Sequence, residues 1–241
     1  MIPKIIHYVW LGKAEMPASA VEYLSGWIKL HPDFEVKKWS EASLPKGIPF
    51  FETAIANKNW SLASDLVRVI ALSREGGIYL DTDVEVIKPL DPLLSSNCFF
   101  GFQSAYTEEL VNGAVIGAVK DHWFINGLIQ EISGGMSGEK AGTFAGPALI
   151  TRKLRDLGLA ETPDTHVQVK DIDVFPRTYF YPYDWNQKVS DAVITADTYA
   201  LHHWAMSWHV KPPLRARILS KLRTLVFEIK KTLKSLLSGR A

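Results

Sequence analysis

The feature that most restricts the possible folds is a predicted helix over residues 61–75 that leads directly into a short buried strand. Ser61 can cap the start of this helix, and Gly76-Gly77 can end it. Its apolar side chains recur at helical spacing, at Ala63, Leu66, Val67, Ile70 and Ala71. Because the apolar strand that follows, residues 78–80, needs partners on both sides, the pattern predicts a sheet covered by helices.

The first forty residues show the same alternation. Residues 4–10 are β-branched and aromatic, residues 18–30 have helical spacing, and residues 34–39 again resemble a strand. We therefore predict an α/β domain with a mainly parallel sheet flanked by helices over residues 1–210. The other predicted elements are strands at 98–103 and 114–119, helices at 123–132 and 147–157, a glycine-rich mobile loop at 133–146 and an extended segment at 167–180.

Composition limits the class of protein. Of the 241 residues, 47% are hydrophobic and 22% are charged, which is ordinary for a domain that buries a full core. The one cysteine, Cys98, permits no intramolecular disulfide, as is typical of a reducing compartment. The N-terminal residues have the composition of a strand and not of a signal peptide, and no run of about 18 apolar residues is present. We expect a cytoplasmic protein.

Two aspartates separated by one residue, Asp81-Thr82-Asp83, follow the predicted strand 78–80. Ligands of open α/β sheets bind outside the carboxyl ends of strands, and strand alternation directs both carboxylates to the same side. Mn²⁺ or Mg²⁺ binds to such oxygens together with substrate phosphates. The motif predicts a metal site. Asp171-Ile172-Asp173 has the same spacing but no preceding helix or glycines, and we predict that it is not a site.

Asp65 and Arg68 lie three residues apart on the predicted helix and so share one part of its surface. One interpretation is a salt bridge within the helix. The other is a sugar site, in which the carboxylate binds sugar hydroxyls and the guanidinium binds the sugar or a diphosphate. The spacing alone leaves both open.

Two segments, Ala63–Arg68 and Gly76–Asp83, resemble family 32 of the glycosyltransferases, which includes fungal α-mannosyltransferases. The large clostridial toxin glucosyltransferases have a related arrangement. Three further segments agree in order: residues 2–12, Gly146-Pro147 and residues 202–208. The resemblance covers residues 2–208. It implies a GT-A fold, a single Rossmann-like domain that binds a nucleotide sugar and a divalent metal.

Residue by residue, the resemblance implies a donor site. Trp10 matches the aromatic residue that stacks on the base, with the backbone of Val9 beside it, and Tyr79 is expected near the nucleotide. Asp65 and Arg68 match contacts to the donor sugar.

The metal site follows from the same resemblance. Asp81 matches the aspartate that faces the ribose and the metal, and Asp83 matches the direct metal ligand. His202 or His203 can supply another ligand or contact the diphosphate, and the Ser207-Trp208 pair can close over it. Because side chains alternate along a strand, only one histidine is expected to face the site, and we favour His202.

The acceptor side and the reaction course are less specific. Asn112-Gly113 and Gly146-Pro147 are candidates for the acceptor side, or are simply a turn and a helix start. The family retains the anomeric configuration, which implies an α-glycoside product. The sequence contains no evident nucleophile, so metal neutralisation of the leaving diphosphate is the central mechanistic expectation.

The C-terminal residues 211–241 form a distinct basic tail. Nine basic residues and one acidic residue give it a net charge of +8, which leaves −7 for the rest of the chain. Leucine and isoleucine recur at spacings of three and four from Leu214 to Leu236, which predicts an amphipathic helix. We expect residues 212–238 to bind the anionic inner face of the cytoplasmic membrane, with packing on the domain or a dimer partner as the alternative. The acidic body argues against nucleic-acid binding.

These predictions combine into one main hypothesis. It is a retaining glycosyltransferase that moves a hexose from a UDP-sugar to a saccharide acceptor, expected to be lipid-linked, in surface-polysaccharide synthesis such as capsule assembly. A GDP-mannose-dependent α-mannosyltransferase is the first alternative. Because Asp81-Thr82-Asp83-Val84 also resembles the nucleophile motif of haloacid-dehalogenase-like phosphatases, that class is a second alternative, and a non-catalytic sugar-binding module is a third.

Overall fold

The computed structural model describes residues 1–43, 47–103, 110–134, 145–187 and 189–205. These residues belong to one compact unit, Met1–Ala205. The predicted basic tail and the boundary between residues 210 and 211 lie outside the described residues, as does most of the loop predicted at 133–146. The membrane helix and the division into domains therefore stay predictions.

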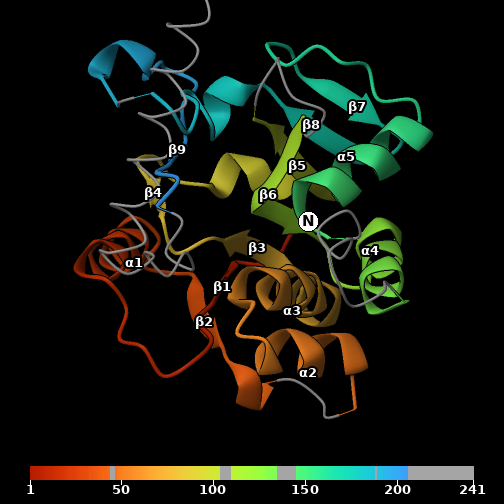
Figure 1. Cartoon of the computed structure of the whole chain (residues 1–241). Helices are drawn as coiled ribbons and strands as arrows, with labels where there is room; N and C mark the ends of the chain where they lie inside the picture. Colours follow the sequence, from red (N-terminus) through yellow and green to blue (C-terminus); the bar gives the residue numbers. More distant parts are fainter. Residues whose placement is uncertain (44–46, 104–109, 135–144, 188, 206–241) are drawn as a thin grey trace, which may run out of the picture. The chain divides into compact units, whose positions relative to one another are not determined.

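A seven-stranded sheet in the order β2-β1-β3-β6-β5-β8-β7 forms the centre of the described unit (Figure 1). Five of its strands run in one direction, and β6 and β7 run in the other. The α/β class with a mainly parallel sheet is thus confirmed. The strands are β1 Ile5–Val9, β2 Glu35–Trp39, β3 Gly77–Leu80, β5 Cys98–Phe102, β6 Val111–Ala118, β7 Val167–Val169 and β8 Ile172–Phe175.

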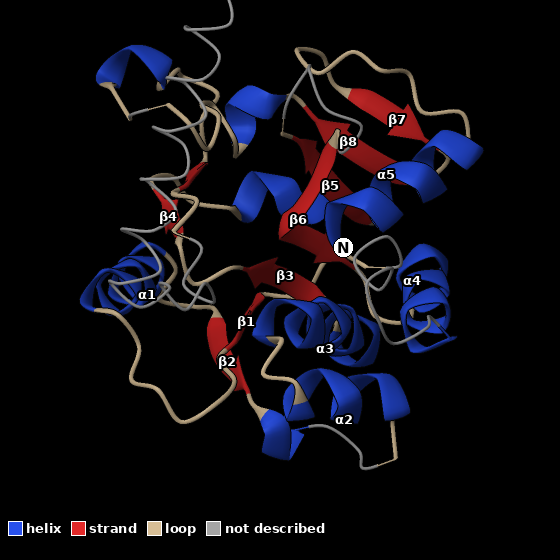
Figure 2. Ribbon diagram, viewed as in Figure 1, coloured by secondary structure: helices blue, strands red, loops and turns tan. Residues whose placement is uncertain are grey.

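Helices cover both faces of this sheet (Figure 2). Helices α2 to α5 contribute to one apolar core together with one set of strand side chains. Helix α1 contributes to a second core on the other face, together with the 3₁₀ turn Asp91–Ser95 and the aromatic residues Phe180 and Tyr181. The helices are α1 Ala18–Leu30, α2 Pro49–Ala56, α3 Trp60–Glu75, α4 Trp123–Gly134 and α5 Gly146–Asp156. Among the described helices, none has the length and apolar character needed to cross a membrane.

The junction between α3 and β3 is locked by the N-terminal strand. Gly76 and Gly77 have positive φ angles of 67° and 108°, and a Cβ atom on Gly77 would lie 2.6 Å from the carbonyl oxygen of Ile5. Nε2 of His7 donates to the Gly76 carbonyl at 2.7 Å, while Nδ1 of His7 accepts from the Trp39 indole at 3.0 Å. Burial lowers the pKa of His7, so the ring is neutral and keeps this pattern. The junction therefore delivers β3 beside β1 with both carboxyl ends at one edge.

A second, two-stranded sheet begins just beyond that edge. After Asp81-Thr82-Asp83 the chain forms β4, Val84–Val86, which pairs antiparallel with β9, Ala200–His202. The register places Val84 opposite His202. The last described residues therefore return to the aspartate motif.

Three local features differ from the sequence-based predictions. Helix α3 is capped by Asn59, whose side-chain oxygen accepts from the Leu62 N–H at 3.3 Å, and not by Ser61. The segment predicted as extended over 167–180 is the hairpin β7–β8 followed by a 3₁₀ turn, because Lys170 adopts a φ of 56° and reverses the chain. Helix α2 was not predicted as an element, and β9 was expected only as extended chain around His202 and His203, without bounds.

Candidate active site

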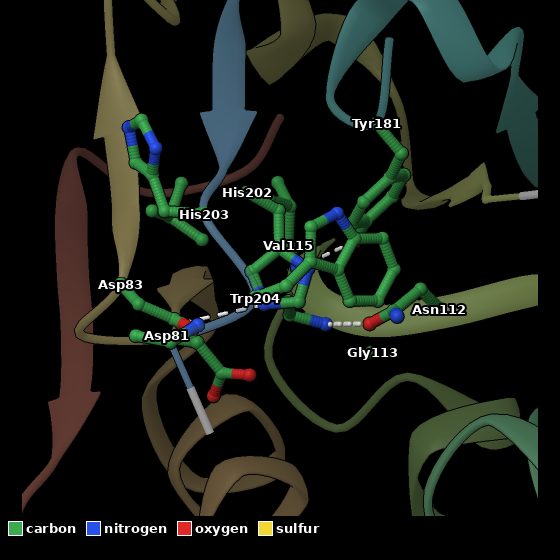
Figure 3. A network of polar contacts seen from close by, with 12 residues as sticks. Asp81, Asp83, Asn112, Gly113, Val115, Tyr181, His202, His203 and Trp204 are labelled. Atoms are coloured by element: carbon green, nitrogen blue, oxygen red, sulfur yellow. Dashed lines mark hydrogen bonds and ion pairs between the residues drawn. The ribbon is translucent and has the colours of Figure 1, made fainter. Parts of the chain in front are cut away.

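Three side chains that can bind a metal converge where β3, β4 and β9 meet. Asp81, Asp83 and His202 each offer one ligand atom, and these atoms lie within 4.8 Å of one another. In the described part of the chain no other group of three acidic, histidine or cysteine side chains has this arrangement. Figure 3 shows Asp81 and Asp83, which lie between β3 and β4, with His202 facing them from the end of β9. The structure thus joins two segments that the sequence analysis had singled out separately.

Asp83 is buried, with 7% of its surface exposed, and is held from the β9 side. Its Oδ2 accepts from the backbone N–H of Ala205 at 2.8 Å, and its Oδ1 lies 3.3 Å from Nε2 of His202. Burial acts to raise the pKa of Asp83, but contact with His202 and the Ala205 N–H outweigh it and lower that pKa. Asp83 is therefore a carboxylate at neutral pH.

His202 is only 4% exposed, yet neither of its ring nitrogens makes a hydrogen bond within the described residues. Nε2 lies near Asp83, but the two groups do not have hydrogen-bond geometry. The ring packs against Trp204, with the ring centroids 4.2 Å apart. A buried polar atom without a partner is costly, and here it stands beside two carboxylates. This donor set of two oxygens and one nitrogen fits a divalent cation.

Asp81 is oriented by a buried cluster around Arg68. The hydroxyl of Tyr79 donates to Oδ1 of Asp81 at 2.6 Å, and Nη2 of Arg68 lies 3.3 Å from the same oxygen. Nη2 also lies 3.1 Å from Oδ1 of Asp65, and Nη1 donates to the Gly113 carbonyl at 2.7 Å. The salt bridge within the helix therefore exists, and the same arginine also contacts Asp81 of the aspartate motif.

The Arg68 guanidinium is 8% exposed and serves as a buried cation. Burial acts against the charged form, but the carboxylates of Asp81 and Asp65 outweigh it and raise the pKa of Arg68. Its Nε makes no hydrogen bond within the described residues. In this structure Arg68 orients Asp81 and Asp65, so direct contact between its guanidinium and a sugar or diphosphate stays a prediction.

Glycines allow this cluster to form. A Cβ atom at Gly113 would lie 3.0 Å from Nη1 of Arg68, and one at Gly146 would lie 3.1 Å from Oδ2 of Asp65. Gly146 also has a φ of 59°. The side chain of Asn112 is buried and bonds to Gln103 and to the Ala114 N–H. Packing therefore accounts for both glycines, and an acceptor role for these segments stays a prediction.

The residues expected at the nucleotide lie at the same sheet edge. Trp10 directly follows β1, whose carboxyl end lies beside that of β3. Trp10 is partly buried, and its indole N–H donates to the carbonyl of Ala14 at 2.8 Å. Val9 and Tyr79 are buried, with 6% and 1% of their surfaces exposed. Tyr79 reaches the site through its hydrogen bond to Asp81.

The C-terminal motif, residues 202–208, begins at the last residue of β9, and its residues have different surroundings. His203 points away from the two aspartates (Figure 3). Ser207 and Trp208 lie outside the described residues. Trp204, which the sequence analysis gave no role, lies beside His202 and donates from its indole to the Tyr183 carbonyl at 3.1 Å. Trp204 has a φ of 52°, which is rare for a bulky residue. Its position within the motif of residues 202–208 was the signal that could have found it.

Comparisons with known proteins agree with this geometry. The family model "Glycosyltransferase sugar-binding region containing DXD motif" matches residues 17–100, and "Alpha 1,4-glycosyltransferase conserved region" matches residues 117–218. A solved structure, the PaToxG glycosyltransferase, has a TM-score of 0.53 at 20% identity and covers 64% of this chain and 69% of that chain. This last likeness is one of fold.

Three relatives illustrate the similarity in sequence. Inositol phosphoceramide mannosyltransferase 3 of Schizosaccharomyces pombe is 32% identical over 136 residues, which are 54% of this chain and 37% of that protein. Lactosylceramide 4-alpha-galactosyltransferase of Mus musculus is 29% identical over 58% of this chain and 40% of its own length. The chain thus spans about two fifths of the length of these two. An uncharacterized glycosyltransferase of Acanthamoeba polyphaga mimivirus, L373, is 25% identical over 88% of this chain and 86% of its own length.

Proposed function

We propose that this chain, which two glycosyltransferase family models match over residues 17–100 and 117–218, transfers a hexose from a nucleotide-diphosphate sugar to a saccharide acceptor in a metal-dependent reaction. The observation that supports this most directly is the convergence of Asp81, Asp83 and His202 beside the buried Arg68. The phosphatase alternative loses its support, since the family models and relatives described above are those of glycosyltransferases.

Asp81, Asp83 and His202 would hold the cation. Mn²⁺ accepts a mixed set of carboxylates and imidazole more readily than Mg²⁺, which prefers oxygen ligands, so Mn²⁺ is the favoured ion. A bound cation would neutralise the negative charge that develops on the departing nucleotide diphosphate.

The chain's own residues fix the rest of the site. Arg68 and Tyr79 hold Asp81 in one orientation, so its carboxylate needs little rearrangement when the donor binds. Asp65 contacts the same guanidinium nitrogen of Arg68 as Asp81 does and is the candidate for the hydroxyls of the donor sugar. Trp10 stands at the same sheet edge and is the candidate for stacking on the base.

The donor, the acceptor and the cellular site are finer proposals. We favour a UDP-hexose and transfer with retention, with GDP-mannose as the alternative donor. The relatives named above include both a mannosyltransferase and a galactosyltransferase, so they do not decide between these sugars. Their names specify ceramide-containing acceptors, which supports a lipid-linked acceptor here. An acceptor in the membrane would suit a protein that is bound to the inner face of that membrane through residues 212–238. We place the reaction in the synthesis of surface polysaccharide.

The experiment is a screen of UDP- and GDP-hexoses with Mn²⁺ and with EDTA, in which release of the nucleotide diphosphate and sugar incorporation are both measured. We expect one donor to be consumed, in a reaction that EDTA stops. Binding of a nucleotide sugar with no turnover on any saccharide or water would instead identify a non-catalytic sugar-binding module. Full activity in EDTA would remove the metal from the proposal.

A further inference from the structure

His203, the residue directly after β9, has a set of contacts that the catalytic proposal does not use. Nε2 of His203 lies 2.8 Å from Oε2 of Glu85, and Nδ1 lies 3.0 Å from the hydroxyl of Tyr183. The ring of Tyr23 stacks on the imidazole, with centroids 4.9 Å apart and planes 5° apart. We call these four residues, Tyr23, Glu85, Tyr183 and His203, the β9 clamp. They come from α1, from β4, from the segment before β9 and from the residue that follows β9.

The hydrogen bonds of the β9 clamp are mutually consistent. Glu85 as a carboxylate only accepts, so Nε2–H of His203 donates to it. With that proton on Nε2, Nδ1 accepts from the Tyr183 hydroxyl, and burial raises the pKa of Tyr183 to about 12, which keeps the hydroxyl proton in place. Both nitrogens of His203 thus have hydrogen-bond partners, whereas neither nitrogen of its neighbour His202 has one among the described residues. The two consecutive histidines have opposite surroundings.

The backbone next to the β9 clamp holds Asp83. The N–H of His203 donates to the Asp83 carbonyl at 2.9 Å, and the N–H of Ala205 donates to Oδ2 of Asp83 at 2.8 Å. Together with the contact between His202 and Asp83, three residues of the segment 202–205 touch this one aspartate. The position of Asp83 therefore depends on where this short segment lies.

The small sheet alone is a weak support for that segment. Strands β4 and β9 have three residues each and pair only with one another among the described residues. A two-stranded sheet of this size is marginally stable in water. Side-chain contacts across it are therefore needed to fix its register, and the hydrogen bond between His203 and Glu85 joins its two strands next to the proposed metal-binding residues.

We propose that His203 and Glu85 are positioning residues for the metal site, which hold the end of β9 so that His202 and the Ala205 N–H orient Asp83. This inference rests on the proposed metal dependence. Neither residue binds the cation. Both act through Asp83 and His202, because residues that hold the ligands of a metal in place also affect how tightly the metal binds.

The test measures Mn²⁺ binding to the full-length protein by electron paramagnetic resonance of free Mn²⁺, without donor or acceptor. We expect His203→Ala and Glu85→Ala each to weaken Mn²⁺ binding about 10- to 100-fold. Glu85→Gln keeps an oxygen acceptor for Nε2–H and should stay within about 3-fold of the wild type. Because His203 and Glu85 act as one pair, the double alanine variant should bind no more weakly than the weaker single variant.

The matched control is His166→Ala, since His166 makes a similar pair with Asp173 at 2.9 Å but lies outside the site. It should leave Mn²⁺ binding unchanged. Thermal unfolding of each variant confirms a folded protein, and Tyr183→Phe, which removes only one hydroxyl, provides a milder variant with an expected loss of about 3-fold.

Unchanged Mn²⁺ binding in folded His203→Ala and Glu85→Ala overturns the positioning role, as does an equal loss in His166→Ala. The failure of the proposed function is a separate result. If the wild type binds Mn²⁺ and the variants do not, but no sugar is transferred, the positioning role stands and the transferase function falls. If the wild type binds no divalent cation, both fall.

Discussion

Two aspartate pairs of identical spacing, Asp81-Thr82-Asp83 and Asp171-Ile172-Asp173, have opposite surroundings in this protein. The first pair converges with His202 on one point. In the second pair, Asp171 accepts from the Trp123 indole at 2.9 Å and lies 3.2 Å from His122, while Asp173 pairs separately with His166. The side chain of Asp171 is 40% exposed, against 17% and 10% for Asp81 and Asp83.

The difference shows that spacing does not make a metal site. What distinguishes the first motif is a third donor from a distant strand and a buried cation, Arg68, that keeps Asp81 in place. In the second motif Asp171 pairs with His122 and Asp173 pairs with His166, so the two carboxylates do not converge on one position where an ion could bind. Its role in the described structure is to connect the β7–β8 hairpin to α4 and to the preceding loop.

The largest expected effect is on catalysis. Asp83→Asn should lower kcat/KM about 10³-fold, roughly 4 kcal/mol of transition-state stabilisation, because the amide carries no charge for the cation. The matched change Asp173→Asn should leave kcat/KM within about 2-fold, since that carboxylate pairs with an exposed histidine. Initial rates of sugar transfer with Mn²⁺ measure both. Equal losses in the two variants would break the comparison.

The next effect concerns the buried cation. Arg68→Met should lower the free energy of unfolding by about 3–5 kcal/mol, because Asp65 and Asp81 would then be buried without a compensating charge. Arg177→Met removes a pair with the exposed Asp164 and should cost less than about 1 kcal/mol. Urea unfolding followed by tryptophan fluorescence gives both values. A cost below 1 kcal/mol for Arg68→Met would show that Asp81 does not depend on it.

A smaller effect is expected from the metal itself. Mn²⁺ at 100 times its dissociation constant should stabilise the folded protein by about 2.7 kcal/mol. For a protein of this size that corresponds to a rise in melting temperature of roughly 5–10 °C. The rise should disappear in Asp83→Asn and His202→Ala and persist in Asp171→Asn. If Asp171→Asn abolished it, the second motif would be the metal site.

The smallest effect is one of pH at the second motif. Burial lowers the pKa of His122 despite the nearby Asp171, so the unfolded chain takes up this proton more readily than the folded protein does. Stability should therefore decrease as the pH falls below about 6.5, by less than about 1 kcal/mol from this residue. His122→Gln should flatten the unfolding free energy between pH 7 and 5.5. A steeper slope in that variant would contradict the assignment.

The elements that could be predicted are those whose signals are local. Helix α1 has the predicted bounds, Ala18–Leu30, because its apolar spacing ends at His31-Pro32. The glycines after α3 placed the aspartate motif correctly at the end of β3. The bounds and the pairing of β9 could not be found in this way, since three residues carry no periodicity and the strand exists through its pairing with β4.

The choice between the two histidines shows the same limit. Alternation predicts that only one of them faces the site, but it does not say which, because that depends on the register of β9 against β4. The register places His202 opposite Val84 and brings it to Asp83. Likewise, the spacing of Asp65 and Arg68 permitted a salt bridge between them but could not show that Arg68 also reaches Asp81, which is a contact between separate elements.

The pairing of β4 with β9 also has a consequence for the order in which a ribosome makes the site. Glu85 and His203 are 118 residues apart, and at typical translation rates that interval takes roughly 6–24 s. During this time a nascent chain presents Asp81 and Asp83 without the histidine and the backbone N–H groups that complete their surroundings. The proposed metal site is therefore complete only after residues 200–205 have left the exit tunnel and joined β4.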